Sequence, residues 1–210
     1  MPPVLLYIHG FNSSPSSMKA QVLKSWLAEH RPDIECLIPE LHHLPQQAIF
    51  QLTELLSAYK ARDVLLIGSS LGGYYSTWLI ECFANRDNHP NLKAVLVNPA
   101  VYPYRLLAEW LGENTNMYTH DKYELTQTHL EQLIQLDCAQ LKDPNKYLLM
   151  TQTADETLDY REAVVKFSAS PQIVQEGGCH GFSDFETMIP TIIDFAYGEL
   201  PSSICEQHHA

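Results

Sequence analysis

The chain is poor in positive charge. It contains 13 Lys and Arg against 25 Asp and Glu, which gives a net charge of −12 at pH 7, and no basic cluster occurs along its 210 residues. The phosphates of nucleic acids and of anionic lipids would repel such a protein. We therefore expect neither a nucleic-acid partner nor attachment to an anionic membrane surface.

Long apolar runs are also missing. No stretch approaches the roughly 20 apolar residues that span a bilayer, and no charged segment followed by an apolar one marks a signal peptide near Met1. The five cysteines are an odd number at irregular spacings, which suits free thiols better than a disulfide framework. These absences predict a cytoplasmic protein without a membrane span.

What the sequence does contain is a regular alternation of apolar and helical segments. Its length and its 45% hydrophobic content fit one domain that buries a full core. Apolar runs, expected to be strands, lie at 4–8, 34–38, 64–67, 94–97, 147–151 and 172–174. Helical patterns lie at about 17–30, 46–59, 74–84, 160–167 and 184–197. Fully apolar strands that alternate with helices predict a parallel sheet covered on both faces.

A Gly-Ser-Ser-Leu-Gly segment at 68–72 joins the third apolar run to the helical pattern behind it. The bare Gly-x-Ser-x-Gly pattern is weak evidence, because it should arise by chance in roughly one chain of fifteen. Its position at a strand-to-helix corner is more specific, since a nucleophile elbow needs glycine where a Cβ atom would clash. The tight turn would hold the serine hydroxyl above the sheet edge. Ser70 is therefore the candidate nucleophile.

A histidine and an acid follow two later apolar runs. Asp155 lies in the loop after 147–151, and His180 lies in a glycine-rich loop after 172–174. The chain order Ser70, Asp155, His180 is the order of nucleophile, acid and histidine in α/β-hydrolases. The pattern predicts that His180 is the base that activates Ser70, and that Asp155 orients and stabilises its imidazole.

Two backbone amides are the expected donors to the oxyanion that forms during acyl transfer. One is the amide of Leu71, which directly follows the nucleophile. The other belongs to the loop 9–14 behind the first strand, where Gly10 lets the backbone turn inward. By analogy with the His-Gly loops of lipases, we assign the second donor to Phe11.

Taken together, these segments resemble the YqiA-like family of small bacterial esterases within the α/β-hydrolase superfamily. The matching stretches are 7–15, 68–74, 98–100, 155–160 and 177–180, so the likeness covers essentially the whole chain. One departure is Ala154, where the family pattern has glycine before the acid. The resemblance implies hydrolysis of carboxylic esters or thioesters, with no metal or organic cofactor.

The same resemblance implies an α/β-hydrolase fold with a trimmed, mainly parallel six-stranded sheet, helices on both faces and the strand order 2-1-3-4-5-6. We expect a single domain over 1–200 and a loose tail over 201–210. The segment 101–145 is too long for a simple crossover, so we interpret it as a small helical lid. Helices are expected at 105–111 and at about 122–141, separated by a polar break at 112–116.

Aromatic residues of this lid are candidates to contact an acyl chain, first of all Tyr102 and Tyr104. The simpler alternative is that most of them pack the lid on the body of the protein. The full set is Tyr102, Tyr104, Trp110, Tyr118 and Tyr123.

Several alternatives remain open at this stage. His9 competes with His180 as the base, but it precedes the nucleophile and is better suited to brace the oxyanion loop. Asp159 competes with Asp155, although its position before 160–167 suits a helix cap, and Glu156 is a weaker candidate. The reaction could be peptide or carbon–carbon bond hydrolysis, or the chain could be a non-catalytic binding protein on the same scaffold. The physiological substrate, the acyl chain length and the oligomeric state stay open.

Overall fold

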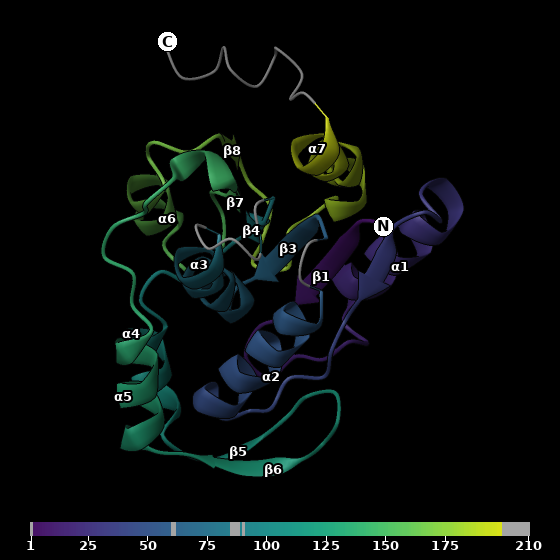
Figure 1. Ribbon diagram of the computed structural model, residues 1–210. Helices are drawn as coiled ribbons and strands as arrows, with labels where there is room; N and C mark the ends of the chain where they lie inside the picture. The colour runs from purple at the N-terminus through teal and green to yellow at the C-terminus, as the bar shows by residue number, and fades with distance from the viewer. Residues whose placement is uncertain (1, 60–61, 85–88, 90, 199–210) are drawn as a thin grey trace.

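The computed structural model describes residues 2–59, 62–84, 89 and 91–198. Its centre is a six-stranded sheet in which every pair of neighbouring strands is parallel, in the order β2-β1-β3-β4-β7-β8 (Figure 1). The strands are β1 (Val4–Ile8), β2 (Glu35–Leu37), β3 (Val64–Ser69), β4 (Lys93–Val97), β7 (Tyr147–Gln152) and β8 (Gln172–Gln175). The expected parallel sheet and its strand order are confirmed.

Helices cover both faces of the sheet (Figure 1). One face carries α1 (Met18–His30) and α7 (Phe185–Tyr197). The opposite face carries α2 (Pro45–Ala58), α3 (Leu71–Phe83) and α6 (Tyr160–Lys166). Because side chains alternate between the two faces of a strand, a sheet that is covered twice needs strands that are apolar throughout.

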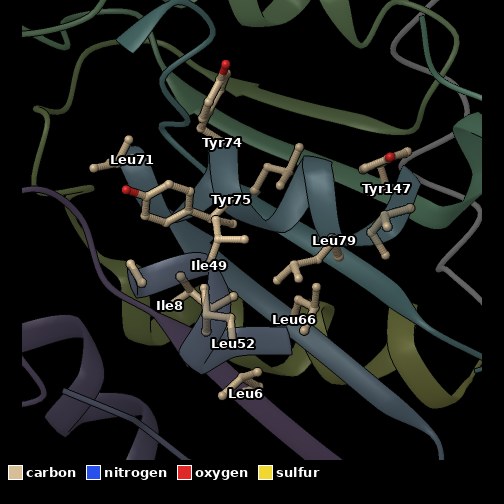
Figure 2. Packing of buried hydrophobic residues seen from close by; sticks show 14 of the residues in the cluster. Leu6, Ile8, Ile49, Leu52, Leu66, Leu71, Tyr74, Tyr75, Leu79 and Tyr147 are labelled. Carbon is tan, nitrogen blue, oxygen red and sulfur yellow. The ribbon is translucent and has the colours of Figure 1, made fainter. Parts of the chain in front are cut away.

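Each face therefore has its own hydrophobic core. Figure 2 shows the larger one, where Leu6 and Leu66 of the sheet pack beneath Leu52 of α2 and Leu79 of α3. Leu5, which neighbours Leu6 in β1, points to the opposite face of the sheet, as do the alternate residues of other strands. These side chains join the core formed with α1 and α7. Two cores share one sheet, and the sheet is the frame that positions the loops at its edge.

The segment between β4 and β7 differs from the expected helical lid. It contains α4 (Pro103–Leu106), the 3-10 helix η1 (Leu107–Trp110), an antiparallel hairpin, α5 (Gln127–Gln135) and the 3-10 helix η2 (Pro144–Lys146). The hairpin consists of β5 (Gly112–Thr115) and β6 (Lys122–Leu125) (Figure 1). The predicted helix over 122–141 was therefore wrong at both ends, and the predicted polar break is the first strand of the hairpin.

The physical reason is the period of burial in β6. Lys122 and Glu124 are exposed, whereas Tyr123 and Leu125 are buried, which is the two-residue period of a strand. In the sequence this short alternation runs directly into the helical pattern of α5, so the pattern predicts a single helix over both segments.

Two further expectations concern the ends of the chain and the membrane. The loose tail expected at 201–210 lies outside the described residues. None of the described helices combines the length and the apolar character that crossing a bilayer requires.

Candidate active site

The corner between β3 and α3 holds Ser70 in an unusual backbone conformation. Its φ is 55° and its ψ is −119°, in the region of positive φ that side chains rarely adopt. A Cβ atom on Gly68 would lie 2.4 Å from the carbonyl oxygen of Gly72, and one on Gly72 would lie 1.9 Å from that of Ile8. Both glycines are therefore required by the close approach of β1, β3 and α3, as the elbow pattern predicts.

Backbone hydrogen bonds hold the corner in place. The amide of Ser70 donates to the carbonyl of Val97 at 3.1 Å, and the carbonyl of Ser70 accepts from the amides of Gly73 at 2.9 Å and Ala100 at 3.0 Å. The strained serine is thus fixed between the ends of two adjacent strands, β3 and β4. Strain of this kind persists only where the surrounding structure determines it.

Asp155 and His180 meet at the carboxyl ends of β7 and β8. Nδ1 of His180 lies 2.8 Å from Oδ2 of Asp155 and 3.0 Å from Oδ1. Oδ1 also accepts the backbone amides of Thr157 at 2.8 Å and Leu158 at 2.9 Å. Burial alone would raise the pKa of Asp155, but the hydrogen bonds from His180 and these amides outweigh it and lower the pKa. Asp155 is therefore a carboxylate at neutral pH.

The loop that carries His180 is fixed by two buried polar side chains that follow apolar strand segments. Oε1 of Gln152 accepts the amides of Cys179 at 3.1 Å and Ser183 at 2.8 Å. Nδ2 of Asn98 donates to the carbonyls of Cys179 at 2.9 Å and His180 at 3.2 Å. Sequence reasoning did not single out either side chain. The sequence signal that could have identified both side chains is a polar residue at the end of an otherwise apolar run.

Glycine is needed in this loop as well. Gly178 has a φ of 77°, and a Cβ atom there would lie 2.0 Å from Oε1 of Gln152. Glu156, the weaker of the two alternative acids, accepts the backbone amide of His180 at 2.9 Å rather than its ring. It therefore supports the loop and does not replace Asp155.

The structure brings Ser70 and His180 to one cavity of about 230 Å³. Its wall also includes Gly10 and Phe11 from the loop behind β1. Residues that sequence reasoning missed line it too: Ser17, Met18, Lys19 and Met117. Asp155 does not line this cavity but contacts the ring of His180, which does, so the cavity and this contact connect the three predicted residues.

The two amides expected to stabilise an oxyanion flank this cluster. Phe11 lines the cavity that contains Ser70, and Leu71 lines a neighbouring cavity of about 460 Å³. Within the part of the chain that the structure describes, neither amide donates to a protein acceptor. Amides left without a protein partner beside a nucleophile are available to a substrate oxygen.

His9, the alternative base, serves the loop and not the nucleophile. Its Nε2 accepts the amide of Leu41 at 3.2 Å, which leaves the proton on Nδ1, and Nδ1 donates to the carbonyl of Gly10 at 3.0 Å. Burial lowers the pKa of His9 and so favours this neutral form. His9 thus braces the loop that carries Phe11.

The β5–β6 hairpin holds the same loop from the outside. The hydroxyl of Tyr123 donates to Oδ1 of Asn12, and Nδ2 of Asn116 donates to the carbonyl of Ser13 at 3.1 Å. The ring of Tyr123 also packs edge-on against Phe11, with 6.2 Å between the ring centroids. The inserted segment therefore helps to set the conformation of the candidate oxyanion loop.

The tyrosines expected to contact substrate lie elsewhere. Tyr102 lines a different cavity, beside α6, together with Asp137 and Lys166. Tyr104 donates its hydroxyl to Oδ2 of Asp137 at 3.1 Å. Among the described residues these two tyrosines pack the insertion against the larger core, and Tyr118 is the lid tyrosine that reaches the cavity of Ser70.

Asp159, the other alternative acid, caps α6. Its Oδ1 accepts the amide of Arg161 at 3.0 Å, and its carboxylate pairs with the guanidinium of the same residue at 2.8 Å. Within the described ranges, no group of three or more His, Cys, Asp and Glu side chains could hold a metal ion.

The sheet order and the loops at its carboxyl edge define the class of this protein as the α/β-hydrolase fold. Similar solved structures include a provisionally named hydrolase of Agrobacterium vitis S4, which is 18% identical with a TM-score of 0.73 over 93% of this chain and 88% of its own. Alpha/beta hydrolase domain-containing protein 10 from mouse is 15% identical with a TM-score of 0.69, over 92% and 89%. The monoacylglycerol lipase of Paleococcus ferrophilus is 13% identical with a TM-score of 0.63, over 91% and 94%.

At such low identities these similarities establish the fold. The family follows from the sequence itself: the chain belongs to the uncharacterised protein family UPF0227, the YqiA-like family, whose model matches residues 4–197.

Proposed function

We propose that this protein is a serine hydrolase that cleaves carboxylic esters or thioesters through an acyl-enzyme intermediate. The observation that carries the proposal is the cluster in which strained Ser70 and His180 share one cavity, while Nδ1 of His180 lies 2.8 Å from a buried carboxylate of Asp155. This is the arrangement of roles on which nucleophilic acyl transfer depends.

The chemistry follows from these positions. With the proton of His180 on Nδ1 and directed at Asp155, Nε2 is free to take the proton of Ser70 as its oxygen attacks the carbonyl carbon. The amides of Phe11 and Leu71 stabilise the tetrahedral oxyanion. His180 then donates its proton to the leaving alcohol or thiol, which yields the acyl-enzyme. Water, activated by the same nitrogen, hydrolyses the acyl-enzyme and regenerates Ser70.

The structural relatives favour esters among the possible substrates. One of the similar folds is named a monoacylglycerol lipase, and another is the esterase domain of a Rhodothermus marinus protein. Peptide or carbon–carbon bond hydrolysis would use the same cluster, because fold alone does not determine the substrate. A binding protein without catalysis would have no need of a strained serine whose flanking glycines are sterically required.

A fluorophosphonate probe tests the proposal directly, since it forms an adduct only with an activated serine. Intact mass spectrometry of the wild-type protein should reveal one adduct, and the Ser70→Ala variant should remain unlabelled. The same substitution should lower kcat for a short-chain aryl ester by roughly 10³- to 10⁶-fold. A folded wild-type protein that takes no label and hydrolyses no ester would contradict the proposal.

A further inference from the structure

A lysine from the other end of the chain reaches the cavity of Ser70. Lys19 lies in the first turn of α1, lines the cavity together with Ser70 and His180, and donates from Nζ to the carbonyl of Gly181 at 2.8 Å. It is 162 residues away from Gly181 in the sequence. Its ammonium group therefore lies beside the loop that carries the candidate base.

The ammonium group has no carboxylate partner. Among the cavity-lining residues in the described part of the chain there is no Asp or Glu, and Lys19 forms no ion pair with any described carboxylate. This is unexpected in a protein with 25 acidic and 13 basic residues. An ammonium carries three N–H donors, and the bond to Gly181 uses one of them.

A purely structural role explains this placement poorly. A cation in the first turn of a helix faces the positive end of the helix dipole, so Lys19 does not stabilise α1. Burial also opposes its charge and lowers the pKa of Lys19 to about 8, although the nearby Cys179 and Asp155 act in the opposite direction. At neutral pH the group is still protonated, so its positive charge is available to a ligand.

The surroundings of Lys19 on both sides define what that ligand can be. The cavity that Lys19 shares with Ser70 is also lined by Met18, Met117 and Tyr118, whose largely apolar side chains are exposed and form what we call its apolar wall. On its other side Lys19 lines a separate cavity with Asp184 and Glu186, neither within 4.0 Å of its Nζ as an ion pair. The described residues that line the cavity of Ser70 thus offer a ligand one ammonium group and an apolar wall, and none of them is Asp or Glu.

We propose that Lys19 is a specificity-determining residue that binds an anionic group of the substrate, a carboxylate or a phosphate, while the apolar wall receives a neighbouring hydrocarbon part. The inference rests on the proposed function, because it assigns the cavity of Ser70 to the substrate. It narrows the substrate class to esters or thioesters that carry a negative charge close to the scissile bond.

The test is a binding measurement that needs no turnover. In the Ser70→Ala protein, calorimetric titration compares 4-butyryloxybenzoate, which is anionic, with its neutral methyl ester. The anionic ester should bind more tightly by about 10- to 100-fold, the effect expected of one hydrogen-bonded charge pair. Adding Lys19→Met should bring the two affinities together, and Lys19→Arg should preserve the preference. Equal affinities in the Ser70→Ala protein, including no measurable binding of either ester, would overturn the inference.

A second measurement separates charge recognition from support of the loop. With Ser70 intact, Lys19→Met should lower kcat/KM for the anionic ester about 10- to 100-fold more than kcat/KM for the methyl ester. Equal losses for both esters would mean that Lys19 only positions the loop through Gly181, which overturns the inference. Failure of the proposed function would look different: Ser70 would take no fluorophosphonate label, while the charge preference in binding would persist. Circular dichroism and Tm verify that each variant folds.

Discussion

At the scale of single residues, Asp155 is subject to two opposing effects. Its side chain is 1% exposed, which by itself disfavours the charged form. Four hydrogen-bond contacts from His180, Thr157 and Leu158 compensate for the lost hydration. Because these contacts exist only in the folded protein, the protonation of Asp155 is linked to folding.

The sign of this linkage gives a prediction. The pKa of Asp155 is lowered in the folded state, so its contribution to stability is present above the ordinary aspartate pKa of about 3.9 and is lost as the pH falls through the lower folded-state value. The Asp155→Asn variant lacks this titration. The difference in the free energy of unfolding between wild type and variant should therefore shrink as the pH is lowered from about 6 to about 3.

Urea unfolding at a series of pH values measures that difference, and the other carboxylates cancel because both proteins contain them. Asp121→Asn is the control, since among the described residues the carboxylate of Asp121, between β5 and β6, accepts no hydrogen bond. A difference for Asp155→Asn that stayed constant across the pH range would mean that the carboxylate is not stabilised by its folded surroundings.

At the scale of elements, the β5–β6 hairpin acts on the site from outside the sheet. Its Tyr123 holds Asn12, which is next to the candidate donor Phe11 and has a φ of 51°. Local sequence patterns do not predict this hairpin, because a strand of four residues merges with the helical pattern that follows. The hairpin is thus a second support for the loop, opposite the internal brace supplied by His9.

Removal of the hydroxyl of Tyr123 should weaken this support and lower the activity. We expect Tyr123→Phe to lower kcat/KM for a neutral ester by roughly 2- to 10-fold, the cost of one hydrogen bond expressed in the transition state. Tyr59→Phe is the control, because it removes a hydroxyl that donates to Glu35 at 2.7 Å, far from Ser70 in the fold. Steady-state kinetics of the two variants test whether the hydroxyl of Tyr123 supports the loop. Equal activities would indicate that the hairpin does not influence the loop.

At the scale of the whole molecule, the parts that could be predicted from the sequence are those that local patterns encode. The six strands are apolar runs, and the elbow is a local pattern of glycines around Ser70. Lys19 could not be found in this way, because its role arises from a contact between α1 and a loop 162 residues away. The same holds for Tyr102, whose position depends on how the insertion packs against α6.

The two hydrophobic cores should unfold together, because both are attached to one sheet. Leu52 of α2 and Ile192 of α7 are each fully buried on opposite faces. Substitution of either by Ala should lower the free energy of unfolding by about 2–5 kcal/mol. The denaturant m value should be unchanged in both variants, since one cooperative unit exposes the same surface.

Urea unfolding followed by circular dichroism and by tryptophan fluorescence checks this expectation. A second transition in only one of the two variants, or transitions that differ between the two probes, would show that the faces of the sheet unfold separately.

The strand order also has a consequence for synthesis on the ribosome. From β4 onward, each new strand of this sheet pairs with the sheet strand made before it, and β8 is added last, at the edge. Ser70 is fixed once β4 has emerged, since its amide bonds to Val97, whereas Asp155 and His180 arrive only with β7, β8 and the loops behind them. If the proposed roles hold, a nascent chain displays its serine before the groups that would activate it, and we expect no ester hydrolysis until β8 and the loop behind it have emerged.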